Sequence, residues 1–249
     1  MKGVDFVGKV FTSNKYGDFE VVEYKDYDNV VVRFLDTGYI TTTQLYHVKD
    51  GAIKDRLQPS VYGVGVLGDS VGMANGEELR EYRLWRGLLY RCYNEKTKNK
   101  IPSYDSCSVS TNFKYFPYFQ NWCYNQVGFN NVGFELDKDI LVKGNKVYSE
   151  DTCVFVPKEV NLLLCNAKRN RGSLPIGVRL SRNKSRYLSY ITKEGRYTGL
   201  GTYGTPEQAF QVYKQTKEAY IKEVANKWKE QIDPRVYDAL MNWEVSIDD

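Results

Sequence analysis

Residues 134–164 read FELDKDILVKGNKVYSEDTCVFVPKEVNLLL, and their pattern predicts a strand, a polar loop, a second strand and a short helix. Apolar and acidic residues alternate from 134 to 140, as expected for a strand. The pair Gly144-Asn145 supplies turn chemistry in the loop. The β-branched and aromatic run 153–156 predicts the second strand. Pro157 ends this strand and also suits the first position of a helix that follows.

This short unit would gather oxygen-bearing side chains. Asp137 and Asp139 stand on the first strand, and Asn161 stands one turn into the helix. Carboxylate and amide oxygens that are few in number leave room for waters and a phosphate group, and such a ligand set suits Mg²⁺. The residue types therefore indicate chemistry on a phosphate as the first function to consider.

The same stretch resembles the H-N-H nuclease motif as phage homing endonucleases carry it. In that family an Asp-His pair ends the first strand, an Asn braces the loop, and an Asn or His on the helix completes the metal site. Residues 136–140, LDKDI, stand where Val-Asp-His-Ile would be, Asn145 lies in the loop, and residues 152–161, TCVFVPKEVN, match the ending. The resemblance implies a ββα-metal unit that nicks or cuts DNA.

This sequence departs from the family at the general base, which is a histidine there. The only histidine of the chain is His47, which we expect to be a surface or half-buried structural residue. Carried over to this chain, the resemblance implies that Asp137, Asp139 and Asn161 are the metal ligands and that the ion is Mg²⁺ or Mn²⁺.

Without the histidine, the resemblance leaves three candidates for the catalytic base: Asp139, Lys138 or a second water. Asn145 would brace the loop of the active site. An aspartate with a pKa near ~4 is a poor proton acceptor at neutral pH beside a metal. We therefore expect slow cleavage or none, and no cofactor if the site is inactive.

The composition predicts a globular protein with one strongly basic segment. The chain has 249 residues, 42% hydrophobic and 27% charged, with a net charge of +4. Between residues 168 and 196, nine bases accompany a single acid, Glu194. Such a segment is typical of a surface that binds a phosphate backbone. The bases are Lys168, Arg169, Arg171, Arg179, Arg182, Lys184, Arg186, Lys193 and Arg196.

The cysteines and the hydropathy of the sequence indicate the cellular compartment in which the protein is expected. The five cysteines are odd in number and include no Cys-x-x-Cys pair, so we expect reduced, mostly buried thiols and no zinc site. Neither a signal peptide nor a run of 18 apolar residues is recognised. These features predict a cytoplasmic protein, in the host cell if a phage encodes it, without a membrane partner.

The first 68 residues read as strands alone. Four β-branched and aromatic runs alternate with turn-forming residues, which predicts a small curled sheet or barrel of SH3-like type. The opening 8–17, GKVFTSNKYG, is similar to segments that precede phage H-N-H proteins. The glycine-rich stretch 59–76 echoes a dinucleotide-binding loop only superficially, because no α/β alternation surrounds it, and predicts a linker or an irregular connection.

Two helical patterns follow this stretch. Residues 77–93 place Leu79, Tyr82, Trp85, Leu89 and Cys92 on one face, which predicts a helix packed on a core. In the resembled nucleases a helix of this kind packs against the metal motif. Aromatic residues then recur at every third position from 113 to 122, which favours core packing over base stacking.

The C-terminal part predicts three short antiparallel strands and a long helix. The segments 177–179, 187–191, 193–196 and 200–203 make up these strands. Thr205-Pro-Glu-Gln208 predicts a capped helix start, with Thr205 as N-cap, proline at the first position and Gln208 reaching back. The tail after residue 232 predicts a short closing helix.

This pattern is similar to the Apetala-type DNA-binding domain of plant ethylene-response proteins and integrases, in which a three-stranded sheet lies in the major groove of DNA. It rests on residues 177–191 and on LGTYGTPEQAFQVY at 200–213. Where that family has a groove-facing tryptophan, this chain has Tyr187 or Leu188 nearby. The resemblance assigns DNA contacts to Arg179, Arg182, Lys184, Arg186, Tyr187, Tyr190, Lys193 and Arg196.

The sequence as a whole predicts an α+β protein with a small β-barrel at 1–68, an H-N-H-like ββα domain at 77–165, an Apetala-type domain at 172–231 and a tail at 232–249. The expected partner is double-stranded DNA, and nothing in the sequence indicates a protein partner. The expected function is that of an H-N-H homing endonuclease relative that nicks DNA with Mg²⁺. The alternative is an inactive DNA-binding regulator or anti-host factor on the same scaffold.

Overall fold

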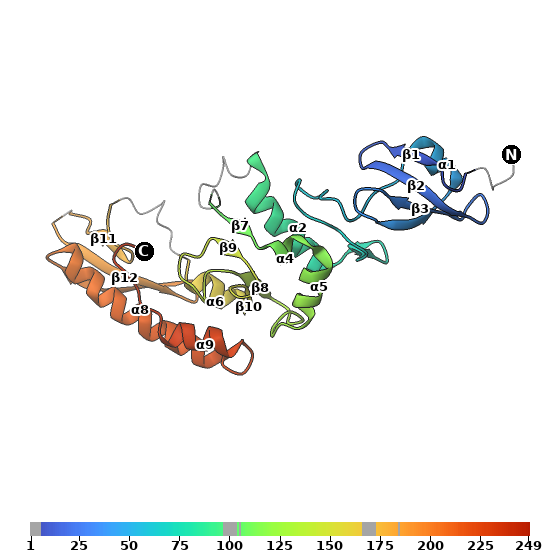
Figure 1. Cartoon of the computed structure of the whole chain (residues 1–249). Helices are drawn as coiled ribbons and strands as arrows, with labels where there is room; N and C mark the ends of the chain where they lie inside the picture. The colour runs from blue at the N-terminus through green and yellow to red at the C-terminus, as the bar shows by residue number, and fades with distance from the viewer. Residues whose placement is uncertain (1–5, 97–103, 105, 166–172, 184) are drawn as a thin grey trace. The chain divides into compact units, whose positions relative to one another are not determined.

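The computed structural model describes residues 6–96, 104, 106–165, 173–183 and 185–249, and shows a mixed α+β protein (Figure 1). The chain forms two compact units. Unit 1 contains residues 1–123 and 146–150, and unit 2 contains residues 124–145 and 151–249. Each unit is described by itself below.

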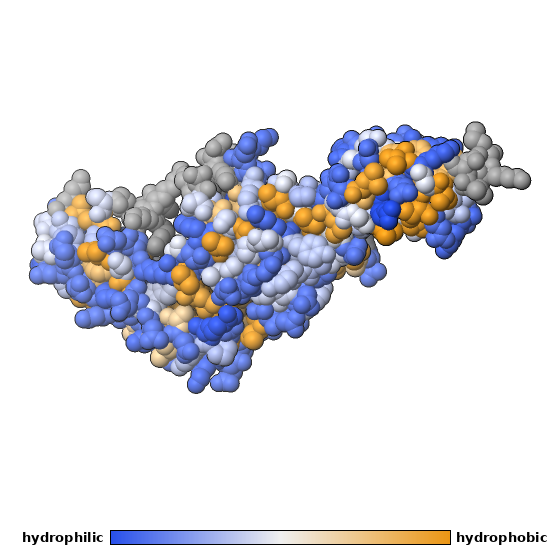
Figure 2. Space-filling model, in the orientation of Figure 1, coloured by the Kyte–Doolittle hydropathy of each residue, from blue (hydrophilic) through white to orange (hydrophobic). Residues whose placement is uncertain are grey.

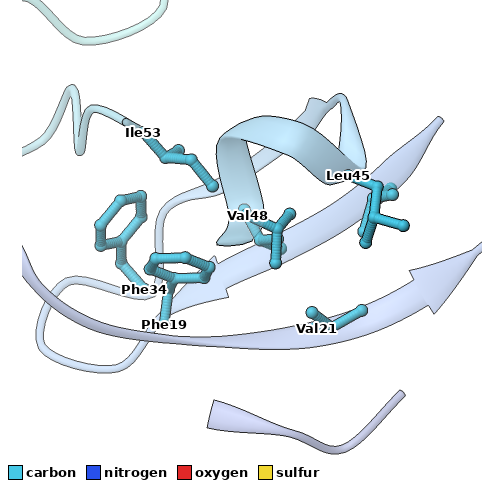
Figure 3. Close-up of a cluster of buried hydrophobic side chains, with 8 residues drawn as sticks. Phe19, Val21, Phe34, Leu45, Val48 and Ile53 are labelled. Carbon is cyan, nitrogen blue, oxygen red and sulfur yellow. The ribbon is translucent and has the colours of Figure 1, made fainter. Parts of the chain in front are cut away.

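Unit 1 begins with a four-stranded antiparallel sheet of order β1-β2-β3-β4 and a short helix, α1. Figure 3 shows Leu45 and Val48 of α1 facing Phe19, Val21 and Phe34 of the strands, and these side chains are buried. The elements are β1 (Val10–Ser13), β2 (Gly17–Tyr24), β3 (Val30–Phe34), β4 (Ile40–Thr43) and α1 (Leu45–Asp50).

The curled sheet expected here is present, whereas the closed barrel is not. Among the described residues, β1 and β4 are the edge strands and no ladder joins them. The apolar face of the sheet is instead covered by α1 and by Ile53, which belong to the same buried cluster. Because a helix already buries this face, the sheet does not need to close on itself to exclude water.

The described residues in the rest of unit 1 form short strands and helices. Its elements are β5 (Met73–Ala74), β6 (Glu77–Glu78), α2 (Arg80–Tyr93), β7 (Ser108–Val109), α4 (Thr111–Lys114), most of α5 (Phe116–Tyr124) and β9 (Val147–Tyr148). β7 and β9 pair in parallel.

The glycine-rich stretch is an irregular connection that packs closely on these helices. A Cβ on Gly65 would lie 2.5 Å from Leu89 Cδ1, so only glycine allows this approach. The Val66 N–H donates to Lys114 O and the Phe116 N–H donates to Val66 O, each at 2.9 Å. The stretch is therefore held in place by its own backbone.

The aromatic stripe forms the core predicted for it. Phe113, Phe116 and Phe119 are fully buried, and Trp122 is nearly so. Trp85, on the apolar face of α2, donates from Nε1 to Phe113 O at 2.7 Å. The tryptophan can be buried because its one polar atom has a partner.

Unit 2 contains a strand-strand-helix unit, a three-stranded sheet and two C-terminal helices (Figure 1). The first consists of β8 (Phe134–Asp137), β10 (Val154–Pro157) and α6 (Lys158–Leu163) and is called the hairpin unit below. The sheet has the order β11-β12-β13, with β11 (Val178–Leu180), β12 (Tyr187–Lys193) and β13 (Arg196–Tyr203). The helices are α8 (Pro206–Trp228) and α9 (Pro234–Met241).

Helix α8 begins at the cap that the sequence predicts. The Gln208 N–H donates to Thr205 Oγ1 at 3.2 Å, and Pro206 occupies the first helical position. Gln208 Oε1 in turn accepts from the Gly204 N–H at 3.2 Å, one residue earlier than the capping box predicts. The helix packs against all three strands of the sheet and buries Phe210, Tyr213 and Ile221 there or beside it.

On the face seen in Figure 2, hydrophilic residues cover most of the surface and apolar residues gather over the N-terminal sheet. Exposed apolar side chains of that part of the chain include Val7, Val10, Leu35 and Ile40. Within the described part of the chain, no helix has the length and apolar character needed to span a bilayer.

Candidate functional site

The hairpin unit has the order of elements predicted from residues 134–164. β8 and β10 pair antiparallel, with Asp137 opposite Val154 and Glu135 opposite Val156. All four residues of β10 are buried, which explains why that strand is apolar throughout rather than alternating. α6 begins at Lys158, because Pro157 ends β10 and takes the N-cap position.

Asp137 closes the turn that follows β8. Its Oδ1 accepts from the N–H groups of Asp139 and Ile140, at 2.7 and 2.8 Å. An aspartate that accepts from the backbone two residues on is typical of such turns. Burial raises the pKa of Asp137 above its ordinary value, although these two hydrogen bonds act in the opposite direction.

Lys138, Asp139 and Asn145 form a closed set of contacts across the loop. The Lys138 ammonium is buried, lies 2.5 Å from Asp139 Oδ1 and donates to Asn145 O at 2.8 Å. Asn145 Nδ2 donates back to Lys138 O at 2.8 Å. These contacts join Lys138, at the start of the loop, to Asn145.

Asn161 reaches β8 at a residue that the sequence analysis did not select. Its Nδ2 donates to Glu135 Oε2 at 2.7 Å. The carboxylates of Glu135, Asp137 and Asp139 all raise the pKa of the Cys165 thiol, after burial, which is the larger cause. These three acids and Asn161 therefore lie around one end of the hairpin unit.

Each of the predicted metal ligands also has a protein partner. Asp137 accepts from the backbone, Asp139 pairs with Lys138, and Asn161 donates to Glu135. Across the described ranges, no three His, Cys, Asp or Glu side chains are grouped to hold a metal ion. A divalent cation on Asp139 would also face an ammonium 2.5 Å from that carboxylate, which is unfavourable. Lys138 would therefore compete with a metal ion for the Asp139 carboxylate.

His47 lies in α1 of unit 1, whereas the acids of the hairpin unit belong to unit 2. It is half-buried, its ring contacts that of Tyr46, and its backbone O accepts from the Gly51 N–H at the end of the helix. The partial burial of His47 agrees with the expectation from the sequence.

The second group of predicted residues lies on the three-stranded sheet, whose two faces differ. Residues directly opposite each other share a face, and successive residues of a strand alternate between faces. One face turns to α8. The other, called the open face below, carries Arg179, Leu188, Tyr190, Thr192, Tyr197 and Thr202.

Arg179 is the centre of the open face. Its guanidinium carbon lies 5.6 Å from the centroid of the Tyr190 ring and 5.0 Å from that of Tyr197. The two rings stack on each other, with centroids 5.3 Å apart. Arg179 and Tyr197 are exposed, so a charged group and an aromatic surface are presented together to solvent.

The remaining predicted DNA contacts divide between several places. Arg182 lies in the exposed loop between β11 and β12, and the Arg186 guanidinium donates to Thr202 O at 3.4 Å. Lys193 belongs to the face toward α8, where its ammonium lies 4.5 Å from the Tyr220 ring centroid and 3.6 Å from Glu223. Tyr187 shares that face, as does the exposed Arg196, opposite Lys193 at the tight turn. Lys184, like Lys168, Arg169 and Arg171, falls outside the described residues.

Sequence reasoning missed three residues of these sites: Glu135, Tyr197 and Lys217. Glu135 alternates with Asp137 on β8, so the strand period could have identified it. Tyr197 could be placed with Arg179 only from the register across two turns, including an irregularity between Ser189 and Tyr190. Lys217 stands between Tyr213 and Tyr220 on the buried side of α8, and a lysine inside an apolar stripe is the signal that identifies it.

Comparison with known proteins returns no relative. No protein-family model, no curated protein and no solved structure matches the chain. The resemblance to H-N-H nucleases and to Apetala-type domains therefore rests on the sequence motifs alone.

Proposed function

We propose that this chain binds double-stranded DNA through the open face of the sheet β11-β12-β13. The observation that carries the proposal is the position of the Arg179 guanidinium against Tyr190 and Tyr197 on an exposed sheet face. Arg182 and Arg186, in and beside the β11–β12 loop, supply further positive charge to the same end of the sheet.

The stacked rings give Arg179 a fixed orientation before DNA arrives. A guanidinium held over an aromatic ring keeps its N–H groups free to pair with a phosphate or with the edge of a guanine. Because the ring contacts already restrict the side chain, less conformational entropy is lost on binding than for a free lysine. The loop bases would add contacts to phosphates, which position the protein without reading sequence.

We further propose that the hairpin unit descends from an H-N-H nuclease and that the chain binds DNA without cutting it. Lys138 places a cation of the protein itself beside Asp139, and no histidine of unit 2 could serve as the base. Binding without hydrolysis thus agrees better with these contacts than metal-dependent nicking does. A role as a regulator or anti-host factor is consistent with this activity.

The binding proposal is tested by the Arg179→Ala variant in a duplex-binding measurement such as fluorescence anisotropy at several salt concentrations. We expect affinity to fall by about 1–3 kcal/mol if Arg179 meets a base edge. If it meets a phosphate, the slope of log K against log salt should fall by about 0.9, the amount expected for one phosphate contact.

Two variants make the test specific for the open face. Lys193→Ala removes a positive charge from the opposite face of the same sheet, and Arg33→Ala removes an arginine from the N-terminal sheet of unit 1. Both should reduce affinity less than Arg179→Ala. If Lys193→Ala weakens binding as much as Arg179→Ala does, the open face is not the DNA-binding face.

Hydrolysis is tested on the same protein with supercoiled plasmid and Mg²⁺ or Mn²⁺. We expect no nicked circles above the level seen with an Asp139→Ala variant. Nicking by the wild type that is lost in Asp139→Ala and in Asn161→Ala would contradict the inactive assignment and support the nuclease.

A further inference from the structure

Unit 2 also contains a pocket on the side of the sheet that faces α8. Its volume is about 430 Å³, within the range of small-molecule sites. It is formed by α6, by the middle and end of β12, and by one face of α8. Tyr213 and Tyr220 contribute aromatic walls, and Leu162, Leu163 and Ile191 contribute aliphatic ones.

One wall of the pocket depends on a glycine. Gly177 has a φ of +73°, and a Cβ at this position would lie 2.0 Å from Tyr213 Cδ2. The backbone therefore lies directly against the buried Tyr213 ring, a contact that any other residue would prevent. The aromatic wall is consequently a fixed feature of the fold.

Among the described residues that line this pocket, Lys217 supplies the only basic side chain. It is half-buried, and burial lowers its pKa to about 8. In the described part of the chain, no hydrogen bond or ion pair engages its ammonium, and the only other group that affects its pKa is the Cys165 thiol. A buried cation without a partner is unfavourable, and an anion beside it would remove that cost.

The two acids that line the pocket do not neutralise this ammonium. Glu159 is paired with the Lys227 ammonium at 2.7 Å and with Trp228 Nε1 at 2.8 Å. Glu194 is exposed at the β12–β13 turn, where its φ is +49°. The lysine is therefore available to a ligand.

We propose that this pocket binds one nucleotide, with its phosphate at Lys217 and its base against the tyrosine walls. Aromatic walls hold a planar base by stacking, and a single buried ammonium selects for an anionic group on the same molecule. The proposal goes beyond DNA binding by the open face and does not require it. The nucleotide can be a free nucleoside monophosphate or one nucleotide of a DNA strand.

Cys165 provides a direct readout of occupancy. It lines the pocket, and it is exposed whereas the other four cysteines of the chain are buried. In the full-length protein, AMP should slow the reaction of this thiol with a thiol reagent, in a saturable manner. Adenosine alone and inorganic phosphate alone should protect less at equal concentration, because each supplies only half of the interactions.

The Lys217→Met variant tests the role of the ammonium. We expect its affinity for AMP to fall by about tenfold or more, since a hydrogen bond to a charged group contributes about 1.5–3 kcal/mol. Lys222→Met is the matched control, because it removes the same charge from an exposed position of α8 that does not line the pocket. Its AMP affinity and its thiol reactivity should equal those of the wild type.

The source of the nucleotide is separated by three probes: AMP, a blunt duplex and the same duplex with a single-nucleotide overhang. Protection by AMP alone assigns the pocket to a free nucleotide, and protection by the overhang but not the blunt duplex assigns it to a DNA strand. Affinity for the blunt duplex, measured by anisotropy, separates this pocket from the open face: Arg179→Ala should reduce it, and Lys217→Met should leave it unchanged.

Three results would overturn the proposal. They are the absence of protection by both AMP and the overhang duplex, protection by phosphate equal to that by AMP, and unchanged AMP affinity in Lys217→Met. The second of these would leave a simple anion site without selection for a base.

Discussion

The Lys217 side chain lies in the wall of the pocket, and burial lowers its pKa from 10.5 to about 8. The folded state therefore binds fewer protons at this position than the unfolded state between about pH 8 and pH 10.5. Stability should rise with pH through that window, and below it the full cost of the buried charge applies. Without an anion beside it, Lys217 destabilises the fold at neutral pH.

Replacing this lysine with methionine should consequently stabilise the chain. We expect Lys217→Met to gain on the order of 1–3 kcal/mol at pH 7, since one pKa unit corresponds to about 1.4 kcal/mol. The gain should shrink as the pH rises from 8 towards 10.5, and urea unfolding at several pH values would measure it. A loss of stability at pH 7 would show that the lysine has a partner in the fold. A gain together with lost AMP binding is typical of a functional site.

In the hairpin unit, the contacts of single residues differ from the metal-ligand roles that the motif implies. The sequence identifies Asp137, Asp139, Asn145 and Asn161 through their spacing. Only the structure shows that Lys138 pairs with Asp139 and that Asn161 donates to Glu135. The spacing of a motif places the oxygen atoms near one another, but it does not say which partner each of them takes.

Among the elements, helix α8 is the one whose start follows most directly from the sequence. Thr205, Pro206 and Gln208 occupy the positions that helix-capping rules assign to them. These rules depend only on neighbouring residues, which is why they succeed here. The buried side is less fully predicted: Phe210 and Ile221 are buried beside the expected Ala209, Tyr213 and Tyr220.

The cap of α8 provides a test at this scale. Thr205→Ala removes the oxygen that accepts from the Gln208 N–H and should cost about 1 kcal/mol of stability. Thr205→Ser keeps this oxygen and should retain most of the stability. Thermal unfolding of the three proteins would measure both effects, and equal melting temperatures would mean that the cap contributes nothing. At temperatures where the Thr205→Ala variant is folded, α8 still supports the sheet. Its duplex binding should therefore equal that of the wild type.

For the three-stranded sheet, the sequence predicts the positions of the strands but not which residues share a face. The strands themselves lie close to where their β-branched and aromatic runs predict them. The list of DNA-contacting residues, however, mixes the two faces of the sheet, because it was carried over from a resemblance without a register. Lys193 and Arg179 are equal as charges in the sequence, yet one contacts α8 and the other lies on the open face.

For the molecule as a whole, neither unit is one continuous stretch of the chain. Residues 124–145 belong to unit 2, residues 146–150 return to unit 1, and the chain from 151 onward belongs to unit 2. The short returning segment matters to unit 1: it supplies β9, the buried Tyr148 and Glu150, which accepts from Ser110 Oγ at 2.9 Å.

A truncation test follows from this connectivity. Two fragments would be compared. The first ends at residue 123 and lacks β9, and the second ends at residue 150 and has a Gly/Ser linker of equal length in place of 124–145. The first should melt at the lower temperature. The reason is that β7 and Ser110 would lose their partners, and an unpaired buried polar group costs about 1–3 kcal/mol. Equal melting temperatures of the two fragments would show that residues 146–150 do not stabilise unit 1.

The sequence by itself determined the class of the fold, the strand-strand-helix order at 134–164, the aromatic core of unit 1 and the capped helix α8. Each depends on periodicity or on turn and cap chemistry, which act between residues near one another in the chain. Tertiary structure alone decided that the N-terminal sheet stays open, which face carries Arg179, which partner holds Asp139, and that Lys217 lines a pocket. These depend on register and on packing between distant segments, where the burial of apolar surface selects among arrangements that local patterns leave equivalent.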